Sequence, residues 1–441
     1  MSRSSPLVGV VVVNYDGGEL TIACLASLAA SDWPADRLRL VLVDNASRDG
    51  VTDRVERETP DVNVIRSSKN LGFAGGCNVG IRTLGDADYV ALVNNDATVD
   101  PGWLRPLVAT LEKDAALGAA CPKILFAGSY REITMEVPTH RRGRGDRRLL
   151  GLRLSGARVD GVDVSARTQF VGDFLGSEPP DRAGNGEWTG GRPTVRLPVS
   201  GISRSSAELR VASDAPKTAR VASGEAVDHL EVPTAPDWRA TPLSGPPLTI
   251  INNVGSLLTD DWYGADRGYL CRDDGQFDDT QEVFAWCGAG VLLRRAHLDD
   301  IGLFDERLFL YYEDLELAWR GQARGWRYRY VPEAVVHHLH AASTVEGSSF
   351  KERFNERNRL LVLTRHARAG VVWRAIGRFL LTTGSYARRD VVARALSGRR
   401  PSTVILRRRL GVLGAFLFRA PGALRSRSSD RRSPARPGAT P

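Results

Sequence analysis

Carboxylates and amides follow each of the early apolar runs of this 441-residue chain. The run that ends near residue 93 is followed directly by Asn94, Asn95 and Asp96. Asn and Asp also make ordinary turns after strands. Their presence at the ends of four apolar runs, however, favours a ligand-binding site at one edge of the predicted sheet. A carboxylate such as Asp96 among amides suits Mg²⁺ or Mn²⁺, which prefer oxygen ligands. The three earlier ends are Asn14-Tyr15-Asp16, Asp44-Asn45 and Asn70.

Two neighbouring acids far along the chain could move a proton. Glu313 and Asp314 open a predicted helix. A carboxylate there, in a pocket rimmed by Tyr311, Tyr312 and Trp286, could act as a general base. Acids at a helix start also serve as caps and interact with the helix dipole, which is the structural alternative.

Histidines gather in the stretch HHLH, which follows an apolar run at 334–336. In an extended strand, His338 and His340 point to one side and His337 to the other. A histidine near Asp96 would complete a metal site. The alternative is a histidine-rich strand end without a ligand.

A glycine-rich stretch, NLGFAGGCNVG, lies at 70–80. Such a stretch lets backbone N–H groups approach an anion closely. It is neither a GxGxxG after the first strand nor a P-loop, because it lacks GK[ST]. Tight packing of a helix on a strand explains the glycines equally well.

The N-terminal third alternates between two periodicities. Continuous β-branched runs are typical of strands buried on both faces, and the stretches between them have helical spacing. This alternation predicts an α/β fold with a parallel sheet, right-handed crossovers and ligands at the carboxyl ends of the strands. The expected strands lie at 8–14, 38–47, 62–66 and up to 96, and the expected helices at 18–30, 50–58 and 75–84.

The hydrophobic periodicity changes from about residue 128 to 248. Short runs of alternating apolar and polar residues there predict a β-sandwich or a similar all-β insert. The stretch SEPPDRAGNGEWTGGRP within it indicates a long loop. Strands and helices alternate again from 249, and helical spacing dominates after 345. The predicted regions are 1–127 and 249–345 as two halves of one α/β domain, 128–248 as the insert, 346–424 as a helical region and 425–441 as a disordered basic tail.

Composition limits the class of protein. No run of about 18 apolar residues is present, so no transmembrane helix is predicted, and the N-terminus resembles a first strand rather than a signal peptide. Five cysteines without CxxC spacing indicate reduced thiols in the cytosol. The net charge is +8, and much of it lies after residue 350. Such a region could meet phosphate, nucleic acid or an anionic membrane, or could be a solvated arginine-rich face.

Six ordered stretches resemble the family 2 glycosyltransferases, in particular the bacterial rhamnosyltransferase-like group that builds cell-wall and surface polysaccharides. The resemblance covers about residues 7–127 and 249–345. It implies the GT-A fold, a Rossmann-like α/β fold with one mixed sheet that binds a nucleotide sugar. The stretches are VVVVNYDGGELTIACLASL, VLVDNASRDG, NLGFAGGCNVGIR, LVNNDATVDPGWL, WCGAGVLLRRAHLDDIGLFDERLFLYYEDLELAWRGQARGW and VVHHLHAAST.

The resemblance also implies a role for each matched residue. Asp96 matches the last acid of the family's metal-binding Asp-x-Asp, Asn94 replaces the first acid, and His338 matches a histidine near the metal. Asp314, beside Glu313, matches the catalytic base. Asn14 and Tyr15 would line the nucleotide pocket, and Asp44 would hydrogen-bond the base. The pocket for the sugar diphosphate would be shaped by Asn70, Gly72, Phe73, Gly75 and Asn78. The dipoles of Asn94 and Asn95 would add to the stabilisation of the diphosphate. The acceptor site would be framed by Trp286, Gly288 and Arg320.

The resemblance implies an inverting enzyme that moves a sugar, rhamnose in this branch, from a nucleotide diphosphate sugar. The acceptor would be a glycan or a polyprenyl-diphosphate-linked sugar, with Asp314 taking the hydroxyl proton and Mn²⁺ or Mg²⁺ neutralising the leaving group. The basic helices would bind the cytoplasmic face of the membrane, without a nucleic-acid partner. Two alternatives remain: a sugar nucleotidyltransferase and a non-enzymatic carbohydrate-binding protein.

Overall fold

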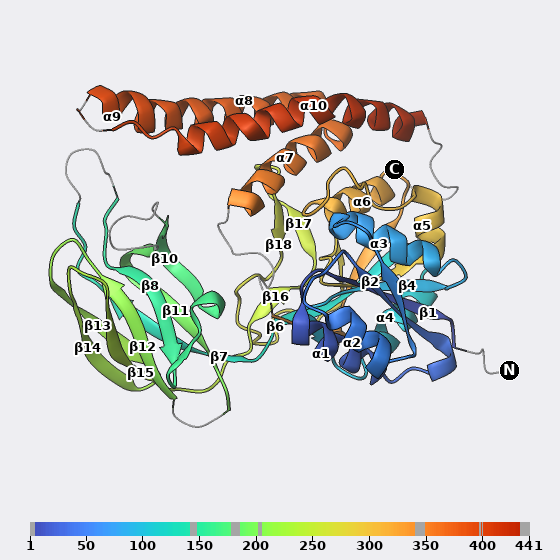
Figure 1. Ribbon diagram of the computed structural model, residues 1–441, viewed down its shortest axis with the longest axis horizontal. Helices are drawn as coiled ribbons and strands as arrows, with labels where there is room; N and C mark the ends of the chain where they lie inside the picture. The colour runs from blue at the N-terminus through green and yellow to red at the C-terminus, as the bar shows by residue number, and fades with distance from the viewer. Residues whose placement is uncertain are drawn as a thin grey trace. The chain divides into compact units, whose positions relative to one another are not determined.

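The computed structural model describes residues 5–141, 148–177, 186–201, 205–339, 349–396, 398 and 400–432 (Figure 1). The chain divides into two compact units. The sheet–helix unit takes in Met1–Ile124, Asn253–Tyr269 and Gln276–Pro441, and the insert unit takes in Leu125–Asn252 and Leu270–Gly275. The sequence predicted boundaries of 128 and 248 for the insert.

The sheet–helix unit is built on a sheet whose strands run in the order β19-β21-β6-β20-β4-β1-β2-β3. Four of these strands are parallel neighbours. The β-branched runs of β1, β2 and β4 are almost fully buried, as expected for strands covered on both faces, whereas the edge strand β3 is only partly buried. They are β1 (Val8–Asn14), β2 (Leu38–Asp44), β3 (Val62–Arg66) and β4 (Tyr89–Asn94). The helices between them are α1 (Gly18–Ala29), η1 (Ala35–Arg37), α2 (Val51–Glu58) and α3 (Gly72–Thr83).

The other half of the sheet is antiparallel. Strand β20 pairs with β4 on one side and with β6 on the other, and β5 pairs with β21. The predicted mixed α/β sheet is therefore confirmed. The elements of this half are β5 (Ala97–Val99), α4 (Leu104–Lys113), β6 (Leu117–Phe126), β16 (Ile251–Asn253), the hairpin β17 (Ser256–Leu258) and β18 (Gly264–Asp266), β19 (Gln281–Val283), β20 (Gly290–Arg294), α5 (Arg295–Ile301), α6 (Glu313–Gln322) and β21 (Arg327–His338).

Part of the glycine-rich stretch serves packing, as the structural alternative predicted. Helix α3 lies so close to strand β1 that a Cβ at Gly80 would clash with the side chain of Val11. Only a glycine lets the helix backbone approach the strand this closely. Packing of α3 on β1 does not explain Gly72, which contacts Phe309 at the site described below.

The insert unit is all-β, but it is not a two-layer sandwich. One antiparallel sheet runs in the order β14-β13-β7-β11-β8-β12-β15, and the end strands β14 and β15 also contact each other. The sheet therefore bends nearly into a barrel around an apolar core that includes Ile133, Leu197 and Leu209. Its strands are β7 (Ser129–Glu136), β8 (Arg153–Val159), β9 (Val162–Asp163), β10 (Gln169–Ser177), β11 (Glu187–Val199), β12 (Ser205–Ala212), β13 (Lys217–Ser223), β14 (Ala226–Val232) and β15 (Asp237–Leu243), with η2 (Ser165–Arg167) between them.

Part of the predicted loop in the insert is strand. The stretch SEPPDRAGNGEWTGGRP begins at residue 177, and its second half, from Glu187, belongs to strand β11. Residues 178–185 lie outside the described residues. Strand pairing of Thr194–Val199 with β7 continues the same strand beyond the glycines.

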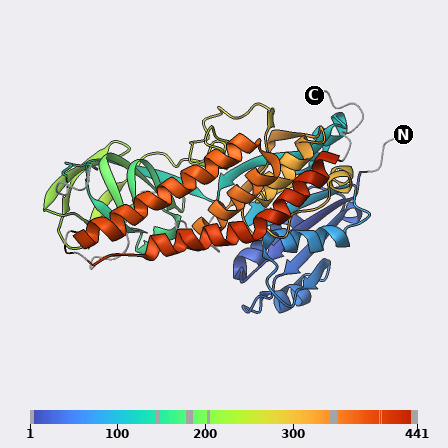
Figure 2. The ribbon, with the colours of Figure 1, turned by 90° about the horizontal axis from the view of Figure 1, so that it is seen from above.

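Helices form the C-terminal part of the sheet–helix unit (Figure 2). Helix α10 packs against α7 and α8 through an apolar core that includes Leu363, Phe379 and Phe416. Helix α10 continues to Arg432, so the prediction of disorder from residue 425 is wrong for 425–432, and 433–441 lie outside the described residues. The elements are α7 (Ser349–His366), α8 (Ala369–Ala387), the π-turn η3 (Arg388–Val392), α9 (Ala393–Leu396) and α10 (Val404–Arg432).

Two predictions from composition can be compared with the structure. Among the described residues, no helix is both long enough and apolar enough to cross a bilayer. The five cysteines, all described, are free thiols.

Candidate active site

The carboxyl ends of the central parallel strands meet at one edge of the sheet. Asn14 at the end of β1 lies opposite Asp44 at the end of β2, and Val13 lies opposite Asn94 at the end of β4. Parallel pairing in register therefore gathers polar groups that are up to 80 residues apart in the sequence, from 14 to 94.

Asn14 holds this edge together. Its side chain is fully buried, and its Oδ1 accepts hydrogen bonds from Thr21 Oγ1 at 2.7 Å and Asn95 Nδ2 at 2.9 Å. Its Nδ2 donates to Ser47 Oγ at 3.0 Å. The amides of Asn14 and Asn95 thus bind each other and the protein. Their contact with the nucleotide sugar stays a prediction. Tyr15, the next residue, is exposed at the same edge.

Asp44 ends strand β2, and Asn45 follows it. Asp44 is buried and accepts a hydrogen bond from the backbone N–H of Ser47 at 3.1 Å. Asn45, to which the sequence analysis gave no role, donates from Nδ2 to the carbonyl oxygen of Gly72 at 2.9 Å. The pair of polar residues after the strand was visible in the sequence, but the hydrogen bond from Asn45 to the glycine-rich stretch was not.

The start of helix α3 is shaped by Asn70 and Gly72. Oδ1 of Asn70 accepts a hydrogen bond from the backbone N–H of Gly72 at 2.8 Å. Gly72 has φ of +73°, and a Cβ there would clash with the carbonyl oxygen of Phe309. Position 72 therefore requires glycine for both its backbone conformation and its contact with the segment that precedes α6.

Three other predicted donor-site residues lie on α3. The ring of Phe73 lies against Gly288, with 2.9 Å between its Cε1 and a Cβ built on that glycine, and Gly75 packs on Leu71. Asn78 is buried, and its side chain exchanges hydrogen bonds of 3.0 Å with the backbone N–H and carbonyl of Phe304. Asn78 therefore holds the 304 segment, and its contact with the sugar diphosphate stays a prediction.

A carboxylate and an imidazole meet beside the end of β4. Oδ1 of Asp96 lies 3.1 Å from Nε2 of His338, and the amide Nδ2 of Asn94 lies 3.4 Å from the same nitrogen. Pairing of β5 with β21 causes this contact, because it places His338 opposite Ala97. His337 points the other way and contacts Asp100 at 3.0 Å.

The Asp96–His338 pair fits a divalent cation that takes only some of its ligands from protein. Both side chains are less than one-tenth exposed, and one oxygen and one nitrogen face each other. Within the described part of the chain, no group of three His, Cys, Asp or Glu side chains is arranged to hold a metal. Mg²⁺ typically binds through one or two carboxylates together with substrate phosphates and water, so this pair would need a diphosphate to complete the coordination.

The acid pair Glu313–Asp314 forms the first turn of α6. Oδ2 of Asp314 accepts a hydrogen bond from the backbone N–H of Gly288 at 3.2 Å, and Oδ1 accepts one from Leu315 at 2.7 Å. Burial raises the pKa of the Asp314 carboxyl, and the charge of Asp266 adds to this increase. Burial also raises the pKa of Glu313, and the Asp314 charge raises it further. A carboxylate with a raised pKa is a better proton acceptor near neutral pH.

The two residues that precede strand β20 connect the acid to the Asp96 side of the edge. The backbone N–H of Gly288 binds Asp314, and the carbonyl of the next residue, Ala289, accepts from the backbone N–H of Asn94 at 3.3 Å. Two consecutive residues therefore join the end of β4 to the first turn of α6. The third acid, Asp266, raises the pKa of Asp314 and itself interacts electrostatically with His338.

Asp266 was missed by sequence reasoning. It ends strand β18, and its Oδ1 accepts a hydrogen bond from Asn253 Nδ2 at 2.6 Å. Neither a motif nor a periodicity in the sequence distinguishes it from the other acids of the 260–279 stretch. Only the fold of the β17–β18 hairpin places it near Asp314.

Two of the predicted acceptor residues contact other parts of the protein. Trp286 is fully buried, and its ring packs edge-on against Tyr328 at 4.8 Å. Arg320 donates to the carbonyl oxygens of Ile301 at 2.7 Å and Leu303 at 2.8 Å. Both side chains therefore have partners within the protein, and their roles at the acceptor stay predictions. Gly288 remains at the site, because its N–H binds Asp314 and its Cα faces Phe73.

The fold and the site define a class of α/β protein that binds its ligand at the carboxyl ends of parallel strands. Two family models match the chain and specify this class. "Glycosyl transferase family 2" matches residues 9–156, and "Glycosyltransferase like family 2" matches residues 272–361. The chain belongs to glycosyltransferase family 2.

Two curated relatives are similar to one part of the chain. Both are described as N-acetylglucosaminyl-diphospho-decaprenol L-rhamnosyltransferase, from Mycobacterium tuberculosis strains CDC 1551 / Oshkosh and ATCC 25618 / H37Rv. Each is 39% identical over 70 residues. The match covers 16% of this chain and spans only 23% of the length of either relative.

Several solved structures are distantly similar. GalNAc-T7 with UDP, GalNAc and Mn²⁺ has a TM-score of 0.44 at 14% identity, over 82% of this chain and 48% of that one. The mannosyltransferase PcManGT from Pyrobaculum calidifontis, with GDP-Man and Mn²⁺, has a TM-score of 0.39 at 14% identity, over 97% and 74%. S. aureus TarS, residues 1–349 with UDP, has a TM-score of 0.40 at 13% identity, over 96% and 90%.

Proposed function

We propose that this protein is an inverting glycosyltransferase that moves a sugar from a nucleoside diphosphate to an acceptor hydroxyl. The observation that supports this best is the link through Gly288 and Ala289, which ties Asp314 to the strand end that precedes Asp96. A proton acceptor and a diphosphate-binding group on one edge are what a displacement at an anomeric carbon requires.

In the proposed reaction, Asp314 accepts the proton of the acceptor hydroxyl. The acceptor oxygen forms a bond to the anomeric carbon as the bond from that carbon to the diphosphate oxygen breaks. Attack from the face opposite the diphosphate inverts the configuration. The hydrogen bonds from Gly288 and Leu315 fix the carboxylate in place without protonating it.

Asp96 and His338 are the side chains that would hold the divalent cation, with Asn94 beside them. A bound Mn²⁺ or Mg²⁺ supplies Lewis-acid neutralisation of the departing diphosphate. The start of α3, which Asn70 and Gly72 shape, brings backbone N–H groups to the same edge. Tyr15 and Asp44 remain the residues proposed for the nucleotide.

For the sugar and the acceptor we propose L-rhamnose and a prenyl-diphosphate-linked glycan of cell-wall or surface polysaccharide synthesis. The support is the 70-residue similarity to the mycobacterial L-rhamnosyltransferases, whose name gives this sugar and an N-acetylglucosaminyl-diphospho-decaprenol acceptor. A lipid-linked acceptor also agrees with the surface of the C-terminal helices.

This surface, the α8–α10 face, consists of exposed apolar side chains with arginines beside them. Leu381 of α8 is 78% exposed and Phe418 of α10 is 82% exposed. The two helices run side by side (Figure 2). Apolar residues that enter the headgroup region between arginines are typical of helices that lie on an anionic membrane. We therefore place the enzyme at the cytoplasmic membrane surface. The exposed side chains of the two helices that we assign to this face are Trp373, Leu380, Leu381, Leu410, Leu417, Phe418 and Leu424, with Arg374, Arg378 (which also pairs with Asp261), Arg407 and Arg425.

The decisive experiment is a donor screen with UDP-, GDP- and dTDP-linked sugars, L-rhamnose among them, in the presence of Mn²⁺. Release of nucleoside diphosphate, with transfer to a prenyl-diphosphate-linked N-acetylglucosamine, is the expected result. Release of a nucleoside triphosphate from a sugar nucleotide and pyrophosphate would instead identify a nucleotidyltransferase. Binding of a sugar without turnover of any donor would contradict the transferase proposal.

A further inference from the structure

The segment immediately before Asp314 has an unusual backbone. Phe309, Tyr311 and Tyr312 have φ values of +67°, +68° and +70°. Bulky aromatic residues rarely adopt this left-handed conformation, because Cβ crowds the following carbonyl oxygen. Three such residues within four positions persist only where surrounding contacts hold them.

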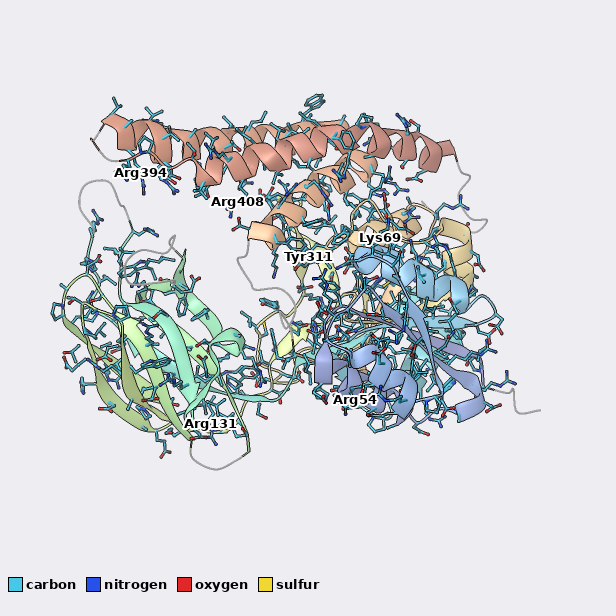
Figure 3. All side chains as sticks on the ribbon, in the orientation of Figure 1. Arg54, Lys69, Arg131, Tyr311, Arg394 and Arg408 are labelled. Carbon is cyan, nitrogen blue, oxygen red and sulfur yellow. The ribbon has the colours of Figure 1, made fainter. Side chains whose placement is uncertain are left out.

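Helix α7 supplies those contacts through one buried amide. Asn358 is fully buried, and its Nδ2 lies within hydrogen-bond distance of three carbonyl oxygens of the segment. The distances are 2.9 Å to Leu308, 2.9 Å to Leu310 and 2.7 Å to Tyr311. Figure 3 labels Tyr311, which lies close to α7. Asn358 thus binds the carbonyls of Leu308 and Leu310, which flank Phe309, and that of Tyr311, which is itself left-handed.

Arg357 sets the orientation of this amide. Its Nε and Nη2 lie 2.8 and 2.6 Å from Oδ1 of Asn358, and its Nη2 also donates to the carbonyl of Leu308 at 2.8 Å. A guanidinium has donors only, so the amide atom that faces it must be the oxygen. The NH₂ group of Asn358 consequently faces the three carbonyls.

The other side of the segment contacts both sides of the site. The carbonyl of Phe309 accepts a hydrogen bond from the backbone N–H of Ala74 at 3.3 Å, in the first turn of α3. The hydroxyl of Tyr312 accepts from the backbone N–H of Gly264 at 3.0 Å, in the hairpin strand that ends at Asp266. The path of the segment therefore sets where Asp314 lies relative to α3 and to Asp266.

We propose that Asn358, oriented by Arg357, is a positioning residue that holds the 308–312 segment in its left-handed path and so fixes Asp314 as the proton acceptor. This inference rests on the proposed function for the role of Asp314. It adds that the C-terminal helical region takes part in building the site, because α7 supplies the amide. Loss of the amide would leave Asp314 present but displaced.

Two variants and one control test this proposal in the full chain. Asn358→Leu keeps the approximate volume and removes the donors, and Asn358→Asp keeps Oδ1 and replaces the donor group by an acceptor that repels three carbonyls. The control is Leu363→Ala on the same helix, which removes a buried apolar side chain and should lower the melting temperature without a change in the segment.

We expect both Asn358 variants to lose about 10- to 100-fold in kcat, a cost that displacement of a reacting group by about 1 Å can produce. The acid limb of the pH profile should also move, because the surroundings of Asp314 change. Leu363→Ala should retain kcat per folded molecule and the wild-type pH profile. An Asn358→Leu variant that keeps both the kcat and the pH profile of the control would overturn the proposal.

Amide hydrogen exchange gives a readout that needs no substrate. Peptides that span 308–314 should lose protection at least about tenfold in Asn358→Leu but not in Leu363→Ala. Unchanged protection in Asn358→Leu would refute the proposal that Asn358 holds the 308–312 segment. If protection falls but the wild-type protein turns over no donor, Asn358 does hold the segment and the proposed function is wrong. Failure of the positioning role and failure of the proposed function are therefore distinguishable.

Discussion

The backbone N–H of Gly288 donates a hydrogen bond to Oδ2 of Asp314 at 3.2 Å. This bond connects the residues leading into strand β20 with the first turn of α6, although the two positions are 26 residues apart. It holds one oxygen of the carboxylate within the protein while burial keeps the pKa of the group raised. The same peptide region reaches Asn94 through Ala289, so short backbone contacts set the separation between the proposed proton acceptor and the proposed diphosphate-binding side.

The first prediction concerns Asp314→Asn, which preserves an oxygen that can accept from Gly288 but removes the proton acceptor. Turnover should fall by about 10²- to 10⁴-fold, the usual contribution of a general base. The affinity for a nucleoside diphosphate with Mn²⁺ should hardly change, because the lost interaction forms only in the reaction. Single-turnover transfer and isothermal titration measure these two quantities. The exposed acid variant Asp36→Asn serves as the control, and near-normal turnover in Asp314→Asn would remove this residue from the mechanism.

The second prediction concerns pH. Asp314 accepts a proton only when it is ionised, and its pKa is raised by burial and then by Asp266. As pH falls through the raised pKa, the base becomes protonated, so the acid limb of kcat/KM should lie above the ordinary carboxyl range. Asp266→Asn removes a neighbouring negative charge and should move this limb to lower pH. Asp260→Asn, an exposed acid in the turn of the same hairpin, should leave it in place. A limb that does not respond to Asp266→Asn would contradict this electrostatic assignment.

The arrangement of the sheet was predictable from local pattern, whereas the closure of the insert was not. Buried β-branched runs separated by helical spacing predict parallel strands wherever they occur, and β1 to β4 follow that rule. The insert has the alternation expected of half-buried strands, but such alternation is the same in a sandwich and in a barrel. Contact between β14 and β15 decides between them, and no local pattern specifies that contact.

The site shows the same division between local and long-range information. Asp96, His338 and Asp314 could be proposed from residue type and from resemblance. The structural use of Asn78 could not, because its partner Phe304 lies 226 residues away. Asn358 likewise carries no local signal, since its three carbonyl partners come from a segment about 50 residues earlier.

The third prediction concerns the metal pair. His338→Ala removes the imidazole that faces Asp96, and it should weaken Mn²⁺-dependent binding of a nucleoside diphosphate by at least about tenfold. His337→Ala is a matched control, because the adjacent ring points away and contacts Asp100. Titration of nucleoside diphosphate with and without Mn²⁺ separates a metal effect from a general loss of structure. An equal loss in both variants, or a loss that appears without Mn²⁺, would show that His338 does not act through a metal.

The fourth prediction concerns the α8–α10 face. Replacement of Leu381 and Phe418 by Glu places two acids where large apolar side chains are now exposed. Binding to vesicles with anionic lipid should fall by at least about tenfold, because each change removes apolar insertion and adds charge repulsion. Thermal stability should change little, since neither side chain is buried in the fold.

Val162→Glu in the insert unit is the control, because Val162 is also an exposed apolar residue. Flotation with anionic and with neutral vesicles measures the effect. Equal flotation of the double variant and wild type would exclude this face as the membrane contact, while loss on anionic vesicles alone would show that charge dominates the contact.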